Sequence, residues 1–70
     1  MKYLVIFEQT DTGYGAYAPD LPGCVATGRT REECARHMKE AIDLHIESLR
    51  KHGEAVPTPS STEAAFIEAA

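Results

Sequence analysis

The N-terminal part of the chain carries short apolar runs of the kind that form β-strands. Aromatic and β-branched side chains are frequent in residues 2–9 and 14–19, and a shorter run over residues 24–28 ends in glycine. Residues 2–9 place apolar side chains on both faces of the expected strand, with Tyr3, Val5 and Phe7 on one and Leu4 and Ile6 on the other. Because such a strand is covered on both sides, we expect it to be central in its sheet or to lie at an interface.

A longer pattern of helical period follows the strands. Between residues 31 and 52 the apolar side chains fall within an arc of roughly 140° when successive residues turn by ~100°. This arc contains Cys34, Ala35, Met38, Ala41, Ile42, His45, Ile46 and Leu49. The opposite face is charged, and Gly53 supplies a C-terminal stop. The pattern predicts an amphipathic helix over residues 31–52 that lies on one face of the sheet.

Local turn and cap signals join these elements. Pro22 and Gly23 predict a type II turn, because proline fixes φ at the first central position and glycine accepts a positive φ at the second. Thr30 and Glu33 predict a capping box, in which the Thr30 hydroxyl accepts from the Glu33 amide and the Glu33 carboxylate accepts from the Thr30 amide. Gly28 closes the third strand just before this cap. All five residues are expected to be structural.

The loop between the first two strands has its own signal. Residues 10–13 read Thr-Asp-Thr-Gly, a composition typical of a hairpin loop. We expect Asp11 to hydrogen-bond its own backbone there and Gly13 to take the left-handed conformation.

Two further segments follow the helix. Residues 54–62 contain two prolines and are expected to form an extended linker. Residues 64–68 predict a weak final strand, which a right-handed crossover would place parallel to the first strand. The expected fold of residues 1–70 is a single α+β domain, β-β-β-α-β, with sheet order 3-2-1-4. One helix packs on this small mixed sheet.

Size and charge narrow the possible partners. The chain has 70 residues and a formal net charge of −4. An acidic chain is repelled by phosphate backbones, so we expect no direct binding of nucleic acid and a better match to a basic partner. A domain this small buries only about 60% of its unfolded surface, and the first strand needs cover on both faces. We therefore expect a homo-oligomer, either a dimer or a dimer of dimers.

The chain shows no secretory signal and no apolar stretch near the ~20 residues that a membrane span needs. We therefore expect a cytoplasmic protein that does not bind membranes. In that reducing compartment Cys24 and Cys34 are expected to be free thiols.

Nothing in the sequence predicts catalysis or a cofactor. A two-metal nuclease needs several converging carboxylates, yet the centre of the first strand carries no acid, and Asp11 and Asp20 are in loops. Cys34 and His37 have a spacing that could share a metal ion, but no further ligands occur at recognised spacings. His45 falls in the middle of the apolar arc, where packing is its expected role.

The segment from Tyr17 to Glu33, followed by the helix, resembles the HicB family of antitoxins from type II toxin–antitoxin pairs. The matching residues are Tyr17, Pro19, Asp20, Leu21, Pro22, Gly23, Cys24, Gly28, Thr30, Glu32 and Glu33, then Glu40, Ala41, Ile42, Leu44 and Glu47. Residues 3–7 and the Val-Pro-x-Pro-Ser run at residues 56–60 fit the same pattern. The resemblance implies a partial ribonuclease H-like fold.

The same resemblance implies a function. HicB-like antitoxins bind HicA-like toxins, which are small basic ribonucleases that cleave mRNA, and mask their active surface. We therefore expect a non-catalytic antitoxin in a short form that lacks the DNA-binding domain found in many family members. The alternative is an orphan oligomeric domain of the same fold, with a structural or small-ligand-binding role.

A surface for the toxin is expected around the second strand and the following turn. Tyr14, Tyr17, Asp20 and Leu21 are the candidate contact residues, because exposed aromatics beside a rigid turn bury much area with few rotatable bonds. In the alternative, Tyr14 and Tyr17 pack in the core or the self-interface and the toxin binds elsewhere.

Overall fold

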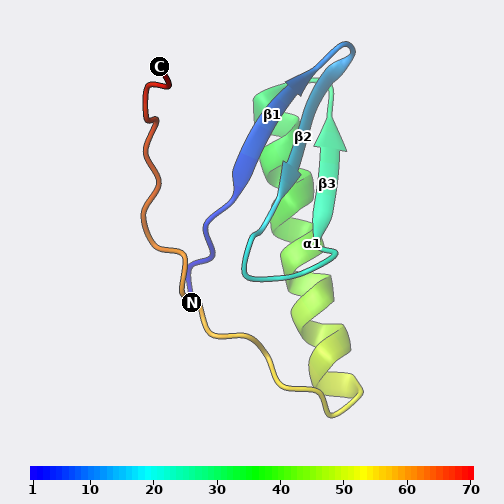
Figure 1. The fold of residues 1–70 in the computed structure, drawn as a ribbon. Helices are drawn as coiled ribbons and strands as arrows, with labels where there is room; N and C mark the ends of the chain where they lie inside the picture. Colours follow the sequence, from blue (N-terminus) through cyan, green and yellow to red (C-terminus); the bar gives the residue numbers. More distant parts are fainter.

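Three antiparallel strands and one helix make up the fold. The structure is a computed structural model that describes residues 1–70. In chain order its elements are β1 (Ile6–Thr10), β2 (Gly13–Tyr17), β3 (Val25–Gly28) and α1 (Arg31–Lys51). The strands form one sheet in the order β1-β2-β3, and α1 lies across one of its faces (Figure 1). The predicted α+β class, with three strands followed by one helix, is confirmed.

The fourth strand is the main error of the sequence prediction. No strand forms in residues 64–68, so the sheet is purely antiparallel and not mixed, and β1 is an edge strand with one partner. No residue after Glu54 takes part in a backbone–backbone hydrogen bond. The alanines at positions 64 and 65 have low β-propensity, and no backbone–backbone hydrogen bond joins this segment to the sheet.

The other element boundaries agree with the prediction to within one or two residues, except at the start of β1. The first strand begins at Ile6 and not at Lys2, because Ile6 pairs with Tyr17, the last residue of β2. Beyond Tyr17 the chain turns away, so residues 2–5 continue without a ladder partner. The helix ends at Lys51, followed by Gly53 at φ +69°.

The core lies between α1 and the sheet. Its six buried residues are Ala16, Ala18, Leu21, Cys24, Cys34 and Met38. Phe7, Ala16 and Ala26 stand in one cross-strand row on the face that α1 covers. The helix packs mainly on β3 and secondarily on β2, so its cover does not extend fully to β1. No helix in the structure has the length and apolar character that crossing a bilayer would require.

The turn and the helix cap follow the sequence signals closely. Gly23 has φ +82°, and the Cys24 N–H donates to the Leu21 carbonyl at 3.0 Å, which closes the type II turn. At the helix start the Glu33 N–H donates to the Thr30 hydroxyl at 3.1 Å. The Glu33 carboxylate, however, accepts from the Arg29 N–H at 2.9 Å and not from Thr30, so only half of the capping box forms as predicted.

Two glycines allow backbone segments to approach closely. A β-carbon at Gly28 would lie 2.5 Å from the Cys34 nitrogen, so the absence of a side chain lets α1 start directly against β3. Gly13 has φ +158° and not the left-handed value near +57° that the loop composition predicts. A β-carbon at Gly13 would collide with the Gly28 carbonyl and lie 2.9 Å from the Arg29 Cα, so crowding, and not a left-handed turn, requires this glycine.

Candidate protein-binding surfaces

The four residues expected to contact a partner do not form one surface. Leu21 has no exposed surface at all and is part of the core. The loop holds it there, because the Leu21 N–H donates to the Ala18 carbonyl and the Cys24 N–H donates to the Leu21 carbonyl, both at 3.0 Å. Leu21 is therefore unavailable to a partner.

The two tyrosines lie on opposite faces of the sheet. Tyr14 pairs with Gln9 and Gly28 on the face that α1 covers, and it packs half-buried against the core. Tyr17 pairs with Ile6 and Val25 on the other face, where 41% of it is exposed. Since side chains alternate along a strand, residues three positions apart point to opposite faces, and this signal was available in the sequence.

Asp20 binds the chain that follows the helix. Its Oδ2 accepts the backbone N–H groups of Ser61 at 2.8 Å and of Ser60 at 2.9 Å. Its Oδ1 accepts the two serine hydroxyls at 3.0 and 3.1 Å. The backbone donors of Ser61 and Ser60 hold the pKa of the Asp20 carboxyl below its ordinary value. We call this arrangement the Asp20 clamp. It fixes the linker against the β2–β3 loop.

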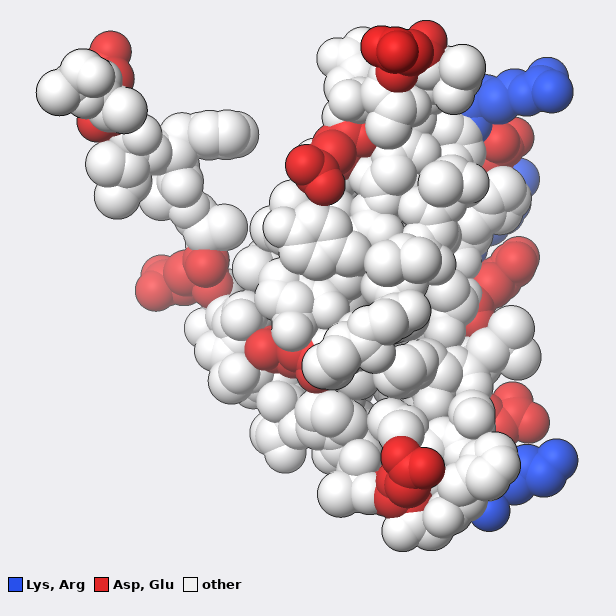
Figure 2. Space-filling model, turned by 45° about the vertical axis from the view of Figure 1, so that its right-hand side comes forward, with Lys and Arg blue, Asp and Glu red and all other residues white.

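The face of the sheet away from α1 has no cover, and we call it the open face. One cross-strand row consists of Ile6, Tyr17 and Val25, and the next of Glu8, Gly15 and Thr27. Val25 is 64% exposed, and the missing side chain at Gly15 leaves a shallow hollow between the two rows. Figure 2 shows a broad, mostly uncharged surface with Asp and Glu around it and Lys and Arg at one margin.

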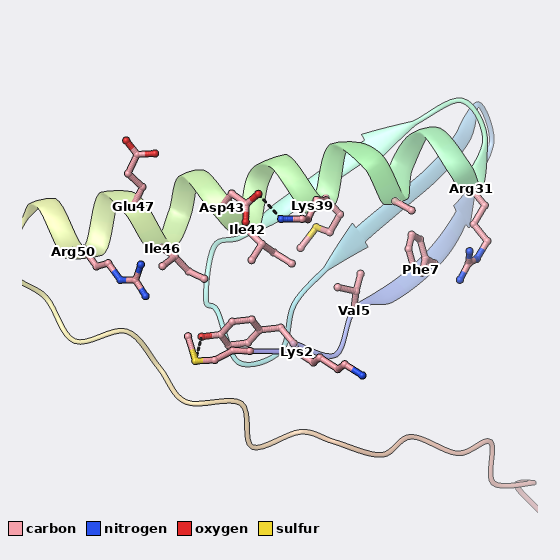
Figure 3. A pocket seen from close by; sticks show the side chains of 14 residues that line it. Lys2, Val5, Phe7, Arg31, Lys39, Ile42, Asp43, Ile46, Glu47 and Arg50 are labelled. Carbon is pink, nitrogen blue, oxygen red and sulfur yellow. Dashed lines mark hydrogen bonds and ion pairs between the residues drawn. The ribbon is translucent and has the colours of Figure 1, made fainter.

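A groove of about 1040 Å³ lies on the helix side of the sheet, between α1 and the N-terminal segment that leads into β1. Its apolar lining consists of Met1, Tyr3, Val5, Phe7, Ala35, Met38, Ile42 and Ile46. Figure 3 shows these side chains converging from the two elements. The groove exists because α1 packs over β3 and β2 and leaves the flank of β1 uncovered. We call it the edge groove.

Basic side chains are concentrated around the edge groove. Lys2, Arg31, Lys39 and Arg50 line it, which is four of the seven Lys and Arg residues in the chain. The Arg31 guanidinium lies 4.3 Å from the centre of the Phe7 ring. Only Lys39 among the four forms an ion pair, with Asp43 at 2.6 Å. The groove thus combines an apolar floor with a net positive rim, although the whole chain is acidic.

The residues considered for metal binding attach α1 to β3. The His37 Nδ1–H donates to the Thr27 carbonyl at 2.7 Å, and the Cys34 thiol donates to the Ala26 carbonyl at 3.8 Å. Both cysteines are free and buried, and burial raises the pKa of the Cys24 thiol. No three His, Cys, Asp or Glu side chains are arranged to hold a metal ion.

The chain is similar to antitoxin sequences over nearly its whole length. The family described as HicB_like antitoxin of bacterial toxin-antitoxin system matches residues 3–69. A UPF0150 protein of Thermoplasma acidophilum is 44% identical over 64 residues, which cover 90% of this chain and 93% of that protein. Antitoxin HicB 2 of Photorhabdus laumondii is 36% identical over 72 residues, which cover 97% of this chain and 49% of the antitoxin. This chain therefore spans about half the length of that relative.

Two solved structures share the fold. A chain of the HicA3 and HicB3 toxin-antitoxin complex superposes with a TM-score of 0.76 at 32% identity, covering 86% of this chain and 70% of that chain. The antitoxin HicB3 crystal structure superposes with a TM-score of 0.71 at 32% identity, covering 86% of this chain and 44% of that chain. The arrangement of three strands and one helix is thus common to all three.

Proposed function

This chain belongs to the HicB-like antitoxins of bacterial toxin–antitoxin systems, and from that premise we propose that it binds and neutralises a HicA-like mRNA-cleaving toxin. The observation that carries the proposal is the similarity over 86% of the chain to a structure solved as a HicA3 and HicB3 toxin-antitoxin complex. Neutralisation would occur in the cytoplasm by stoichiometric masking of the toxin's active surface, with no catalysis by this chain.

The open face is the proposed surface for the toxin. Tyr17 and Val25 present exposed apolar area on a rigid sheet, which costs little conformational entropy when a partner covers it. The net charge of −4 favours encounter with a basic protein. Of the four residues expected to contact the toxin, only Tyr17 belongs to this surface; Tyr14 and Leu21 support the core and Asp20 holds the linker.

Gly15→Arg tests this surface without disturbing the fold. A β-carbon at Gly15 meets no atom within 4 Å, so an arginine there would project onto the open face between Glu8 and Thr27. We expect it to weaken binding to a cognate HicA-like toxin by about 100-fold or more, as steric block and added charge at an interface centre do. Binding is measured by calorimetry and neutralisation by RNA cleavage.

Ser48→Arg is the matched control, because it adds the same charge at an exposed position of α1 away from the open face. It should bind the toxin like the unmodified chain. Full neutralisation by the Gly15→Arg variant would show that the toxin binds elsewhere. Failure of the unmodified chain to bind its cognate toxin would reject the antitoxin proposal itself.

The second candidate function is that of an orphan domain that self-associates or binds a small ligand. The edge groove favours it, because an apolar hollow with a polar rim is the usual form of a ligand site. A small basic toxin gene beside this one, or recovery of such a toxin with the native protein from cell extract, would decide for the antitoxin. Under either function we propose that the chain forms a homodimer or a tetramer.

A further inference from the structure

The last nine residues of the chain form an apolar segment with nothing to cover it. Phe66 and Ile67 are 107% and 90% exposed, which is the largest exposure of any large apolar side chains in the structure. Upstream, the Asp20 clamp holds Ser60 and Ser61, so the point at which residues 62–70 leave the domain is fixed. Beyond it the segment runs extended and stands away from the sheet (Figure 1). We call residues 62–70 the tail.

The edge groove is an apolar surface that no part of this chain covers. Its apolar floor is open, and β1 beside it has an unpaired edge, because the only partner of β1 is β2. Unpaired edge strands readily accept another extended segment. Side chains alternate along a strand, so a tail added to β1 would place one of Phe66 and Ile67 in the groove and the other next to Leu4 and Ile6.

Charge also matches the tail to the groove. Glu63 and Glu68 flank the apolar pair, and residues 62–70 contain no Lys or Arg. The five-residue step between these acids spans about 17 Å in extended chain. Residues 2–7 have the same extended length, and the groove has a basic residue near each end of them: Lys2 at the N-terminal end, and Arg31, which packs on Phe7 of β1. Acid at both ends of the tail therefore meets base at both ends of the groove in either strand direction.

We propose that two copies of this chain exchange tails, so that residues 62–68 of each copy occupy the edge groove of the other. The tail of the single chain stands away from the sheet in Figure 1, and none of residues 62–70 lines its own groove, so a second copy would supply the groove that the tail lacks. The exchange is reciprocal and closed, as in a two-fold dimer. It is independent of the toxin proposal and leaves Tyr17 and Val25 on the open face uncovered.

A charge exchange between two variants tests the proposal. The tail variant carries Glu63→Lys and Glu68→Lys, and the groove variant carries Lys2→Glu and Arg31→Glu. In a homodimer of either variant, like charges meet at both ends of each groove. In a heterodimer of the two variants, opposite charges meet at both ends of both grooves. We expect self-association of each variant to weaken by at least about tenfold, and the equimolar mixture to form a heterodimer of near-unmodified affinity.

Sedimentation at micromolar concentration measures these associations, with circular dichroism to verify the helix. As a second variant, Phe66→Ser with Ile67→Ser should give a monomer, while the control Leu44→Ser, at an exposed apolar position of α1, should stay a dimer. Variants that each dimerise as well as the unmodified chain would overturn the proposal in favour of the open face. A monomeric unmodified chain would also overturn it, and loss of toxin binding by the groove variant would then identify the toxin as the occupant.

Discussion

Among single residues, Asp20 makes the most side-chain hydrogen bonds to the chain that follows the helix. Its carboxylate accepts four hydrogen bonds from Ser60 and Ser61, and hydrogen bonds to a charged acceptor are stronger than those between neutral groups. The neighbouring Pro22–Gly23 turn could be predicted from its two residues alone, because proline and glycine act locally. The partners of Asp20 lie forty residues away, so no spacing in the sequence indicates them.

Asp20→Asn should release the linker while the domain stays folded. The amide has one oxygen and no negative charge, so it cannot accept both the backbone and the hydroxyl donors. We expect hydrogen exchange at the Ser60 and Ser61 amides to speed up by about tenfold or more, measured by NMR. Asp11→Asn, in the exposed hairpin loop, should leave these rates unchanged. Equal rates in the Asp20→Asn variant and the unmodified chain would show that the clamp does not hold the linker.

Acid should release the linker in the same way. The backbone donors of Ser61 and Ser60 lower the pKa of the Asp20 carboxyl in the folded chain from its ordinary value of 3.8. A lowered pKa means that the clamp contributes fully above that value and is lost as the pH falls through the lower, folded one. The Ser60 and Ser61 amides should therefore stay protected at pH 5 and lose protection in the region below 3.8. An onset of exchange above pH 5 would contradict this assignment.

At the scale of elements, the contact between β3 and α1 is set by Gly28. The helix begins three residues after this glycine, and the close approach leaves no room for a side chain. Glu33 strengthens the same junction, because its carboxylate accepts the Arg29 N–H, which lowers the pKa of Glu33. The junction thus depends on a small residue and a helix cap, both of which are visible in the sequence.

Gly28→Ala should destabilise the domain by about 1–3 kcal/mol, the usual range for an added carbon in a packed site. The new carbon would lie 2.5 Å from the Cys34 nitrogen, a backbone atom that cannot move aside alone. Gly15→Ala is the matched control, since its β-carbon would meet nothing within 4 Å, and its effect should stay within about 0.5 kcal/mol. Urea denaturation at one fixed protein concentration measures both, and equal midpoints would refute the crowding argument.

The elements differ in how far the sequence predicts them, and the reason is physical. The sequence predicts the helix to within one residue because its apolar period lies within it and its cap and glycine stop lie directly beside its ends. Residues 64–68 have weak intrinsic β-propensity, so whether they form a strand depends on a neighbour that the sequence does not specify. The candidate surface fails for a different reason. Alternation along the strand already places Tyr14 and Tyr17 on opposite faces, and local hydrogen bonds of the Leu21 backbone hold its side chain in the core.

At the scale of the whole molecule, the charge is unevenly distributed. Four of the seven basic residues line the edge groove together with two acidic ones, Asp43 and Glu47, so the groove carries more basic than acidic side chains although the whole chain is acidic. The open face and the groove lie on opposite sides of the sheet. A basic toxin and an acidic tail can therefore bind the same molecule without competing for one surface.

Binding of duplex DNA by this chain should be negligible at physiological salt. The net charge of −4 opposes approach to phosphates, and the basic residues of the groove line an apolar hollow and not an extended basic stripe. Gel-shift titration should show no retarded species below micromolar protein. Submicromolar binding that weakens with added salt would contradict this expectation.

The Asp20 clamp also has a consequence for the order of folding. β1, β2, β3 and α1 each pack on elements close to them in the chain, and such local contacts form quickly. The clamp instead closes a loop of forty residues, which costs conformational entropy. Its hydrogen bonds can offset that cost only after the turn at Pro22 and the helix have formed. It should therefore close last, and until it closes the linker and tail of a newly made chain are free to meet another copy.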